Sequence, residues 1–401
     1  MRILRPLRSR AVVLVWTSQI LAATGTEFYM VAVIWIATSM IGRDAGYVSA
    51  LISGTLLFGS LFGGILTDRW RAGTTMVAAS LARAVVLGAF AAAALAGSLS
   101  LLLLGGLAIL VSLASALFEP ALQSAIPVLA ADPDERHAAN SLFDATRRVA
   151  RILGPSLIAL VGTAVPIGDF FIVTAGAFLV SAACVAAGLR RIELPPREPV
   201  HGVAGVLDSL TGGWHAVRTH PVMAYGLFAS FVGNIGWGLV IVLGLVLHLR
   251  ATVAEPLAAY GLAMTAYGVG NVLASVVLAG QRPRPVAWIV LAKLMFGTGV
   301  ALMPFAGGQA TLMLCAFFAA FNGPLENLSL FHMIQNDFPA QRLAQVFRLM
   351  MAMVFSGGLV AYLAAPTLYA AFGVERTMTG IGLVIVAVGL AGLPLALRRG
   401  S

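Results

Sequence analysis

The sequence has few charged residues. Asp, Glu, Lys and Arg make up only 10% of its 401 residues, whereas 60% are hydrophobic, and the mean hydropathy is +0.95. A soluble domain usually carries about 25% charged residues, so this composition excludes an ordinary soluble enzyme. Because a helix needs roughly 20 apolar residues to cross the bilayer core, we predict an all-α membrane protein. Its length accommodates about twelve transmembrane helices.

Cysteine and catalytic motifs are also scarce. The two cysteines, Cys184 and Cys315, lie in apolar stretches and predict neither a disulfide framework nor a metal site. The GxxxxGK[ST] phosphate-binding pattern is absent, which argues against ATP-driven transport by this chain. HExxH and GxSxG patterns are absent too. We therefore expect no cofactor, no metal and no enzymatic activity.

The charges that are present are mainly basic and unevenly placed. The net charge is +9, and the first basic cluster precedes the first apolar stretch at Arg2, Arg5, Arg8 and Arg10. Further clusters lie at 69–71, 136–151, 190–218, 282–284, 342–348 and 398–399. The intervening connections hold only Arg43, Arg250 and Arg376. This alternation fits the positive-inside rule and predicts an even number of spans with both termini cytoplasmic. It also indicates contact with anionic lipid, not with nucleic acid.

The apolar stretches predict twelve transmembrane helices in two sets of six. They cover 11–41, 46–67, 72–96, 99–127, 139–163, 168–189, 221–249, 257–279, 285–305, 309–333, 342–371 and 377–397. We therefore predict an N-terminal half at 1–189, a central cytoplasmic loop at 190–220 and a C-terminal half at 221–401. Within the loop, helical spacing of apolar residues from Val206 to Val217 predicts a short helix on the membrane surface.

A charged loop between the second and third predicted helices carries the strongest motif. It reads Gly64-Ile65-Leu66-Thr67-Asp68-Arg69-Trp70-Arg71 and resembles the loop signature of the major facilitator superfamily. The resemblance implies a secondary transporter with two pseudo-symmetric six-helix halves around a central cavity. Weak similarity between 68–71 and 281–284, at an offset of 213 residues, agrees with such a duplication. Trp70 departs from the small or flexible residue common at its position.

Other segments resemble one branch of that superfamily. Residues 118–121, 126–127, 138–142 and 151–155 are similar to bacterial macrolide-efflux and enterobactin-exporter type members. This resemblance implies efflux across a bacterial inner membrane. Antiporters often carry further glycines around the Gly154-Pro155 pair, but here Ser156 to Ala159 follow it.

A set of charges at the predicted cytoplasmic ends of helices suggests a conformational gate. The resemblance implies that Asp68 stabilises the outward-facing state by contacting the start of span eleven. It also implies that the arginines of the loop contact Glu119 in span four. In the first half, Glu119 lies near the end of span four, close to Arg147 and Arg148 at the start of span five. In the second half, Glu326 lies near the end of span ten, close to Arg348 at the start of span eleven. The alternative is that these charges only anchor helix ends at the lipid headgroups. The candidate gating residues are Gly64, Asp68, Arg69, Arg71, Glu119, Arg147, Arg148, Glu326 and Arg348.

Ionisable residues inside predicted spans are costly and need a partner or a function. Glu27, in the middle of span one, is the predicted proton-coupling residue, since a carboxyl in an intermittently wet site can load and release a proton. Its alternative is a permanent pair with an arginine of a neighbouring helix. Asn234 stands 207 residues later, at the corresponding position of span seven. Arg83 is expected to be structural, and Lys293, the only lysine, is expected to extend toward the cytoplasm without a role.

Polar residues at cavity depth form the candidate substrate site. Arg151 could bind an anionic substrate or neutralise Glu27, or it could pair structurally with Asp144 or Glu119. The candidate substrate-binding residues are Gln19, Glu27, Tyr29, Arg151, Asn234 and Asn322.

The sequence therefore predicts proton-coupled export of a small amphipathic molecule, a drug or a siderophore-like metabolite, by alternating access. The expected partners are this substrate, protons and the lipid bilayer, with the proton motive force as energy source and a monomeric chain. A proton symporter or facilitator that imports a small nutrient is the first alternative. A non-transport protein, such as a membrane-embedded enzyme or receptor, is the second.

Overall fold

The computed structural model describes residues 6–67, 70–130, 165–190, 202–278 and 284–398, with Gln281 and single positions between 131 and 164. Within these ranges every element of secondary structure is a helix. Nine helical stretches of the described chain are long and apolar enough to cross a membrane. One of them, Arg10–Phe62, is 53 residues long and covers the first predicted span and most of the second. The predicted all-α membrane fold is confirmed, and the nine stretches are consistent with twelve helices.

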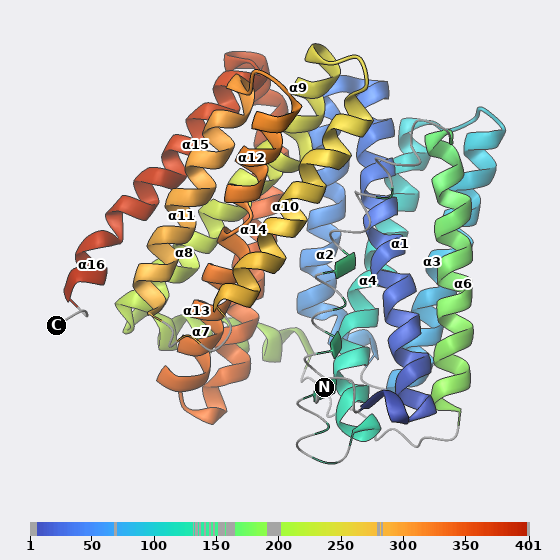
Figure 1. Cartoon of the computed structure of the whole chain (residues 1–401). Helices are drawn as coiled ribbons and strands as arrows, with labels where there is room; N and C mark the ends of the chain where they lie inside the picture. Colours follow the sequence, from blue (N-terminus) through green and yellow to red (C-terminus); the bar gives the residue numbers. More distant parts are fainter. Residues whose placement is uncertain are drawn as a thin grey trace. The chain divides into compact units, whose positions relative to one another are not determined.

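The chain divides into two compact units. The first comprises Met1–Ala37 and Phe58–Gly202, and the second comprises Thr38–Leu57 and Val203–Ser401. Helix α2 therefore contributes to both. The remaining helices of the first unit, shown in blue to green in Figure 1, are α1 (Arg10–Ile41), α3 (Ala72–Leu95), α4 (Leu101–Leu129) and α6 (Phe170–Leu189), and α2 itself spans Ala45–Thr67.

Small residues allow the helices of the first unit to pack closely. A Cβ on Gly59 of α2 would lie 2.4 Å from the Cβ of Ala116 on α4. Ser18 of α1 and Ser181 of α6 share a hydrogen bond of 2.8 Å, and Ser80 of α3 lies 3.4 Å from the same hydroxyl. Small and hydroxyl-bearing residues at helix contacts are typical of membrane proteins, where apolar burial alone does not hold helices together.

The second unit contains the other α-helices of the described chain. In chain order these are α7 (Gly202–Arg218), α8 (Pro221–Gly236), α9 (Leu245–Thr252), α10 (Pro256–Leu278), α11 (Pro285–Leu302), α12 (Gln309–Ala319), α13 (Asn322–Asp337), α14 (Ala340–Phe372), α15 (Val374–Ala391) and α16 (Leu393–Arg398). Helices α8, α11, α13 and α14 meet in one apolar cluster that includes Met223, Ile289, Leu330 and Val346, each at most 1% exposed. This core holds in place the three helices that carry the polar site described below.

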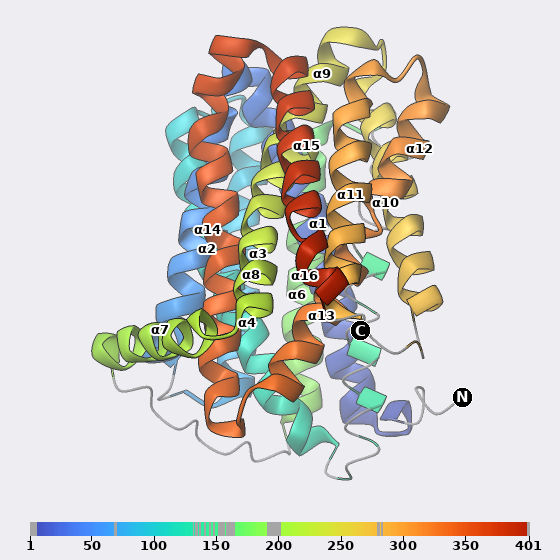
Figure 2. The ribbon, with the colours of Figure 1, turned by 90° about the vertical axis from the view of Figure 1, so that its left-hand side faces the viewer.

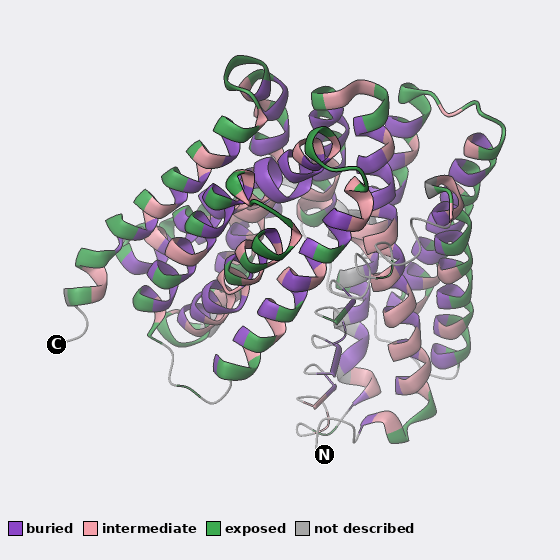
Figure 3. Cartoon of the chain, turned by 45° about the horizontal axis from the view of Figure 1, so that its top comes forward, coloured by how far each residue is buried: buried purple, intermediate pink, exposed green. Residues whose placement is uncertain are grey.

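The outer faces of the helices are apolar. Leu102 on α4 is 88% exposed and Val85 on α3 is 70% exposed. In Figure 3, buried and exposed residues lie on opposite sides of many described helices. Exposed large aliphatic side chains over whole helix faces are unusual for a soluble monomer, and they are what a lipid-facing surface requires.

The predicted helix in the central loop is present as α7. Val206 and Val217 are fully buried, whereas Leu207 and Trp214 are more than half exposed. Gly213 faces α14, where a Cβ would lie 2.6 Å from the backbone oxygen of Gln345. Figure 2 shows α7 running across the ends of α8 and α14, not along them. The amphipathic helix is confirmed, and its place on the membrane surface stays a prediction.

Two predicted spans are not single regular α-helices in the structure. Span 221–249 contains a π-helical segment, Trp237–Gly244, in which Leu239 accepts a hydrogen bond from the Tyr369 hydroxyl of α14. Span 309–333 consists of α12 and α13, separated by Ala320 and Phe321. Pro324 explains the second interruption, because its ring fits the first turn of a helix but not a helix interior.

Candidate functional site

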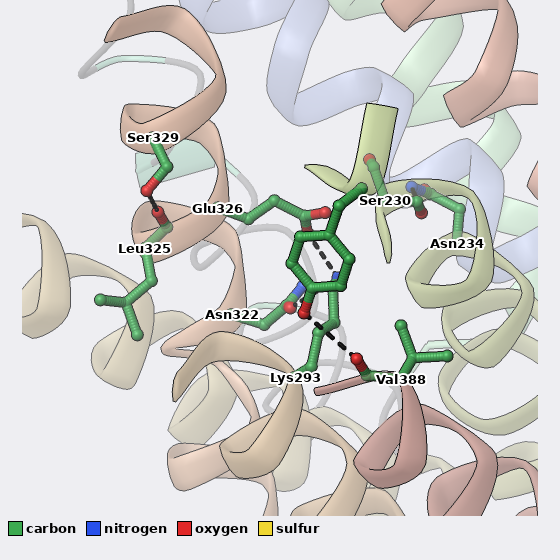
Figure 4. Close-up of polar contacts among 9 residues, drawn as sticks. Ser230, Asn234, Lys293, Asn322, Leu325, Glu326, Ser329 and Val388 are labelled. Atoms are coloured by element: carbon green, nitrogen blue, oxygen red, sulfur yellow. Dashed lines mark hydrogen bonds and ion pairs between the residues drawn. The ribbon is translucent and has the colours of Figure 1, made fainter. Parts of the chain in front are cut away.

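The most distinctive polar group of the second unit is a buried ion pair. Lys293, near the middle of α11, is 0% exposed, and its Nζ lies 2.8 Å from Oε2 of Glu326 on α13. The same ammonium donates a hydrogen bond of 3.0 Å to Oδ1 of Asn322, one turn earlier on α13 (Figure 4). The expectation that Lys293 extends toward the cytoplasm was wrong, because α13 supplies two oxygen partners inside the unit.

The pair is surrounded by apolar residues and helix backbone. Ala292 and Leu325, the sequence neighbours of the two charged residues, are buried in a common apolar cluster. On α8, a Cβ at Gly233 would lie 2.5 Å from Lys293 Nζ, and on α15 a Cβ at Gly389 would lie 3.1 Å from Lys293 Cβ. Two glycines therefore allow the backbones of α8 and α15 to approach the lysine.

Such an environment makes the two charges dependent on each other. Removal of one partner from a buried ion pair typically costs about 3–5 kcal/mol, because the remaining charge is left uncompensated. Replacement of both partners by uncharged residues is often nearly neutral. The pair is therefore weak evidence for stability, and a buried ionisable group inside a membrane span is more often functional.

The pair also has unused hydrogen-bonding capacity. In the part of the chain that the structure describes, Glu326 Oε1 is buried and has no hydrogen-bond partner. Asn322, in contrast, is only partly buried. Tyr225 of α8 donates its hydroxyl to the backbone oxygen of Val388 on α15 at 3.1 Å. A buried carboxylate oxygen without a partner can accept a proton.

Asn234 lies on α8, one residue beyond Gly233. It is partly exposed, and its Nδ2 donates a hydrogen bond of 2.9 Å to the backbone oxygen of Ser230. Figure 4 shows Ser230 and Asn234 together on α8, beside the ion pair. Of the predicted substrate-binding residues, the structure therefore places Asn322 in contact with this pair, on α13, and Asn234 beside it, on α8.

In the first unit, Glu27 is partly exposed on α1. Its neighbours Gly25, Phe28 and Tyr29 pack against the unit: Gly25 lies against Thr174 of α6, and the Phe28 ring lies 5.6 Å from that of Phe170. With 3.6 residues per turn, Glu27 points to the opposite side of α1. Its proton-coupling role stays a prediction.

Gln19 and Tyr29, two other predicted substrate contacts, are 2% exposed. Gln19 Nε2 donates a hydrogen bond of 3.4 Å to the backbone oxygen of Phe143, and Gln19 Oε1 has no partner among the described residues. The Tyr29 hydroxyl lies 3.5 Å from the backbone oxygen of Ala108. Both residues are held in the packing of their own unit, and their substrate contact stays a prediction.

Arg83 is 2% exposed in α3, where a structural role was expected. Its guanidinium lies between the rings of Phe118 and Phe178, 4.6 Å and 4.2 Å from their centroids. Its Nε donates to the backbone oxygen of Ala79, and its Nη2 donates to Ser80 Oγ. These contacts join α3 to α4 and α6.

The predicted gate is described only in part. Gly64 lies in α2, Arg71 is exposed immediately before α3, and Arg348 is partly exposed on α14. The structure pairs Glu326 with Lys293 and not with Arg348. The gating roles stay predictions. Outside the described residues lie Asp68, Arg69, Arg147, Arg148, Arg151 and the side chain of Glu119.

The sequence did contain a signal for the ion pair that was missed. Lys293 is the only lysine of the chain, and it lies in a predicted span 33 residues before a carboxylate in the next one. Two opposite charges inside adjacent spans are expected to pair, because an unpaired charge inside the membrane is costly.

The chain matches the Major Facilitator Superfamily over residues 15–362. A peptide transporter, POT, solved in complex with sulfate, is 16% identical, with 97% of this chain and 95% of that chain covered and a TM-score of 0.74. The nucleoside transporter NupG is 12% identical, with 96% and 99% covered and a TM-score of 0.71. At these identities the likeness concerns the fold alone. Among curated proteins, none matches the chain significantly.

Proposed function

Because the chain belongs to the major facilitator superfamily, and is therefore a multi-pass membrane transporter of a small molecule, we propose that it works by proton-coupled export. The exported molecule is small and amphipathic, a drug or a siderophore-like metabolite. The cycle is alternating access, in which two conformations expose the substrate site to opposite sides of the membrane.

The Lys293–Glu326 pair supports the coupling of transport to protons in either direction, because it places ionisable groups inside the second unit. Glu326 is buried inside a span of the second unit, and its Oε1 has no hydrogen-bond partner among the described residues. A transporter coupled to protons needs a group inside a span that takes up and releases a proton. Each proton that crosses the membrane then gains about 2.3 kcal/mol per 100 mV of membrane potential. Glu27, partly exposed on α1 of the first unit, is the proposed coupling carboxyl at which proton and substrate compete.

Export, not uptake, is supported by the sequence. Residues 118–121 and 151–155 resemble those of bacterial exporters, and the loop at 64–71 resembles the superfamily's gating loop. In the proposed cycle, Asp68 stabilises one conformation and the neighbouring charges of the gate form ion pairs that break in the other. We further propose a bacterial inner membrane, cytoplasmic termini and a monomer.

Accumulation of fluorescent amphipathic compounds in expressing cells tests this proposal. Wild type should lower accumulation, and a protonophore should abolish the effect. Glu27→Gln and Asp68→Asn should abolish it as well, whereas Asp44→Asn, which changes an exposed carboxylate, should leave it intact. Export that survives both the protonophore and Glu27→Gln would contradict proton coupling at Glu27.

Proton-coupled uptake of a small nutrient is the second candidate, and the Lys293–Glu326 pair favours it. When the carboxyl beside this lysine takes up a proton, its negative charge is lost. A negatively charged substrate is then not repelled, so proton and substrate can bind at the same time, as uptake together with a proton requires. Under this candidate the same cells accumulate a labelled nutrient faster at low external pH, and they do not extrude the fluorescent compounds.

A further inference from the structure

Two aromatic side chains of the second unit meet inside its predicted spans. Trp237, at the start of the π-helical segment, and Tyr267 of α10 have ring centroids 5.2 Å apart and an interplanar angle of 59°. Both residues are partly exposed. Aromatic rings at such separations attract each other, so a third planar ring would gain the same attraction on the surface that this pair leaves uncovered.

This uncovered surface faces away from the lipid. On α10, Leu262 and Val269 are more than 40% exposed. Because a helix turns by about 100° per residue, Tyr267 lies roughly opposite these two residues. On α8, Phe228 is 53% exposed, and Trp237 points about 180° away from it. The partial exposure of the two rings is therefore not part of the apolar outer surface.

Two amides lie next to the aromatic pair. Asn271 is one helical turn from Tyr267 on α10. A Cβ on Gly323 of α13 would lie 2.8 Å from Asn271 Nδ2, so this amide reaches the first turn of α13, where Asn322 precedes the glycine. Asn271 and Asn322 are both partly exposed. The aromatic rings are therefore continuous with a polar edge that two helices provide.

The contacts return to the aromatic pair through Lys293. Its Nζ donates to Asn322 Oδ1 at 3.0 Å and would lie 2.5 Å from a Cβ on Gly233 (Figure 4). Gly233 stands one turn before Trp237, on the same side of the seventh predicted span. Residues of four predicted spans thus surround one place in the second unit. We call it the aromatic–amide site, and it consists of Trp237, Tyr267, Asn271 and Asn322.

The aromatic–amide site keeps hydrogen-bonding capacity and has no net charge. In the described part of the chain, Asn271 uses an N–H for Ala320 O, and Asn322 uses its oxygen for Lys293. An amide has an acceptor oxygen and an NH₂ donor group, so the Asn271 oxygen and the Asn322 nitrogen can still bind a ligand. Lys293 and Glu326, 2.8 Å apart, balance each other's charge. An acceptor and a donor beside a flat apolar surface suit an uncharged ligand.

We propose that the aromatic–amide site binds an uncharged, planar aromatic part of the transported molecule. The ring of that molecule lies against Trp237 and Tyr267. Its N–H or O–H group donates to Asn271 Oδ1, and its carbonyl or ether oxygen accepts from Asn322 Nδ2. Small-molecule sites typically combine aromatic walls with a few polar groups of this kind. The inference rests on the proposed transport of an amphipathic molecule, and it narrows that molecule to an aromatic one with an amide-like group.

Equilibrium dialysis of the purified full-length protein tests the site, with the same detergent on both sides of the membrane. The probes are naphthamide, acetylnaphthalene, which has a similar shape but no N–H donor, and decalin carboxamide, which keeps the amide on a saturated body. Wild type should bind naphthamide roughly three- to tenfold more tightly than the saturated amide and roughly fivefold more tightly than the ketone. Binding of naphthamide no tighter than that of either counterpart would overturn the proposal.

Variants of Trp237 separate this site from ordinary helix packing. Trp237→Leu removes the ring and should lose the preference for naphthamide over the saturated amide, whereas Trp237→Phe keeps a ring and should retain most of it. Trp214→Leu, at a 55% exposed position of α7, is the matched control and should bind like wild type. Thermal unfolding shows whether each variant folds, and Tyr267→Leu takes the place of Trp237→Leu if that variant does not. An unchanged preference in the folded leucine variant would overturn the proposal.

Failure of this site and failure of the proposed function give different results. A preference for naphthamide that Trp237→Leu removes, in a protein without protonophore-sensitive export, would support the site and contradict export. Protonophore-sensitive export of the fluorescent compounds by a protein that binds the three probes equally would support export and overturn the site.

Discussion

Gly233 and Lys293 lie in such close contact that a Cβ on the glycine would stand 2.5 Å from the lysine Nζ. The contact joins the backbone of α8 to the middle of α11. On its other side the ammonium holds Glu326 of α13 at 2.8 Å. One buried charge therefore links three helices of the second unit.

Substitution Gly233→Ala should destabilise the protein. The added methyl group meets Nζ, so either α8 or the ion pair must move, and such overpacking typically costs about 1–3 kcal/mol. Gly380→Ala on α15 is the matched control, because no other part of the described chain comes within 4 Å of an added Cβ there, and alanine favours a helix more than glycine does. Thermal unfolding of the purified variants measures both. Equal melting temperatures for the two would contradict the close contact.

Loss of one partner of the ion pair should cost more than loss of both. Lys293→Gln leaves Glu326 without a counter-charge, and we expect a loss of about 3–5 kcal/mol. The double variant with Glu326→Gln should recover most of it, since no buried charge remains. Melting temperatures of the three proteins provide the comparison. A double variant no more stable than Lys293→Gln would show that the two residues do not act as a pair.

Arg83→Lys should destabilise the first unit although it keeps the charge. The guanidinium lies between two aromatic rings and also donates from Nε to Ala79 O, and a lysine cannot reproduce this planar contact. Each cation–π contact of a desolvated arginine contributes up to about 2 kcal/mol. Arg43→Lys, at an exposed position, is the control and should be neutral. The rate of heat inactivation distinguishes the two variants.

Tyr369→Phe should weaken the π-helical segment of the seventh predicted span. The Tyr369 hydroxyl donates to Leu239 O inside Trp237–Gly244, and its removal leaves a buried carbonyl with one partner fewer. The expected cost is about 1–3 kcal/mol. Hydrogen exchange of the amides in this segment should accelerate, whereas Tyr47→Phe, at a half-exposed position, should leave it unchanged. Unaltered exchange in Tyr369→Phe would mean that the hydrogen bond does not support the segment.

Hydropathy predicted the helices well because membrane spans need long apolar runs. The predicted span 285–305 corresponds to α11, Pro285–Leu302, and 342–371 corresponds to α14, Ala340–Phe372. The interruption between α12 and α13 was not predicted, although Asn322-Gly323-Pro324 stands there. A hydropathy window averages over such short breaks, and the proline alone does not distinguish a kink from the start of a new helix.

The candidate site was predicted less well, for a physical reason. Glu326 was assigned to a cytoplasmic gate by its place near a predicted helix end, and Lys293 was assigned no role. Their pairing depends on how α11 and α13 are rotated toward each other, and one residue of rotation changes a side chain's direction by about 100°. Sequence gives the depth of a charge in a span more readily than the face on which it lies.

Helix α2 belongs to both compact units, and this has a consequence for synthesis. A Cβ at Gly46 would lie 2.7 Å from Tyr362 O of α14, and Ser53 donates to Phe355 O of the same helix. Gly59, further along α2, packs against Ala116 of the first unit. When the ribosome has completed α2 at Thr67, α14 begins about 270 residues later, at Ala340. The ribosome adds about 5–20 residues per second, so α14 follows only after many seconds. The beginning of α2 therefore enters the bilayer before its packing partner α14 has been made. Two fragments produced by a cut in the central loop should each need the other in order to fold.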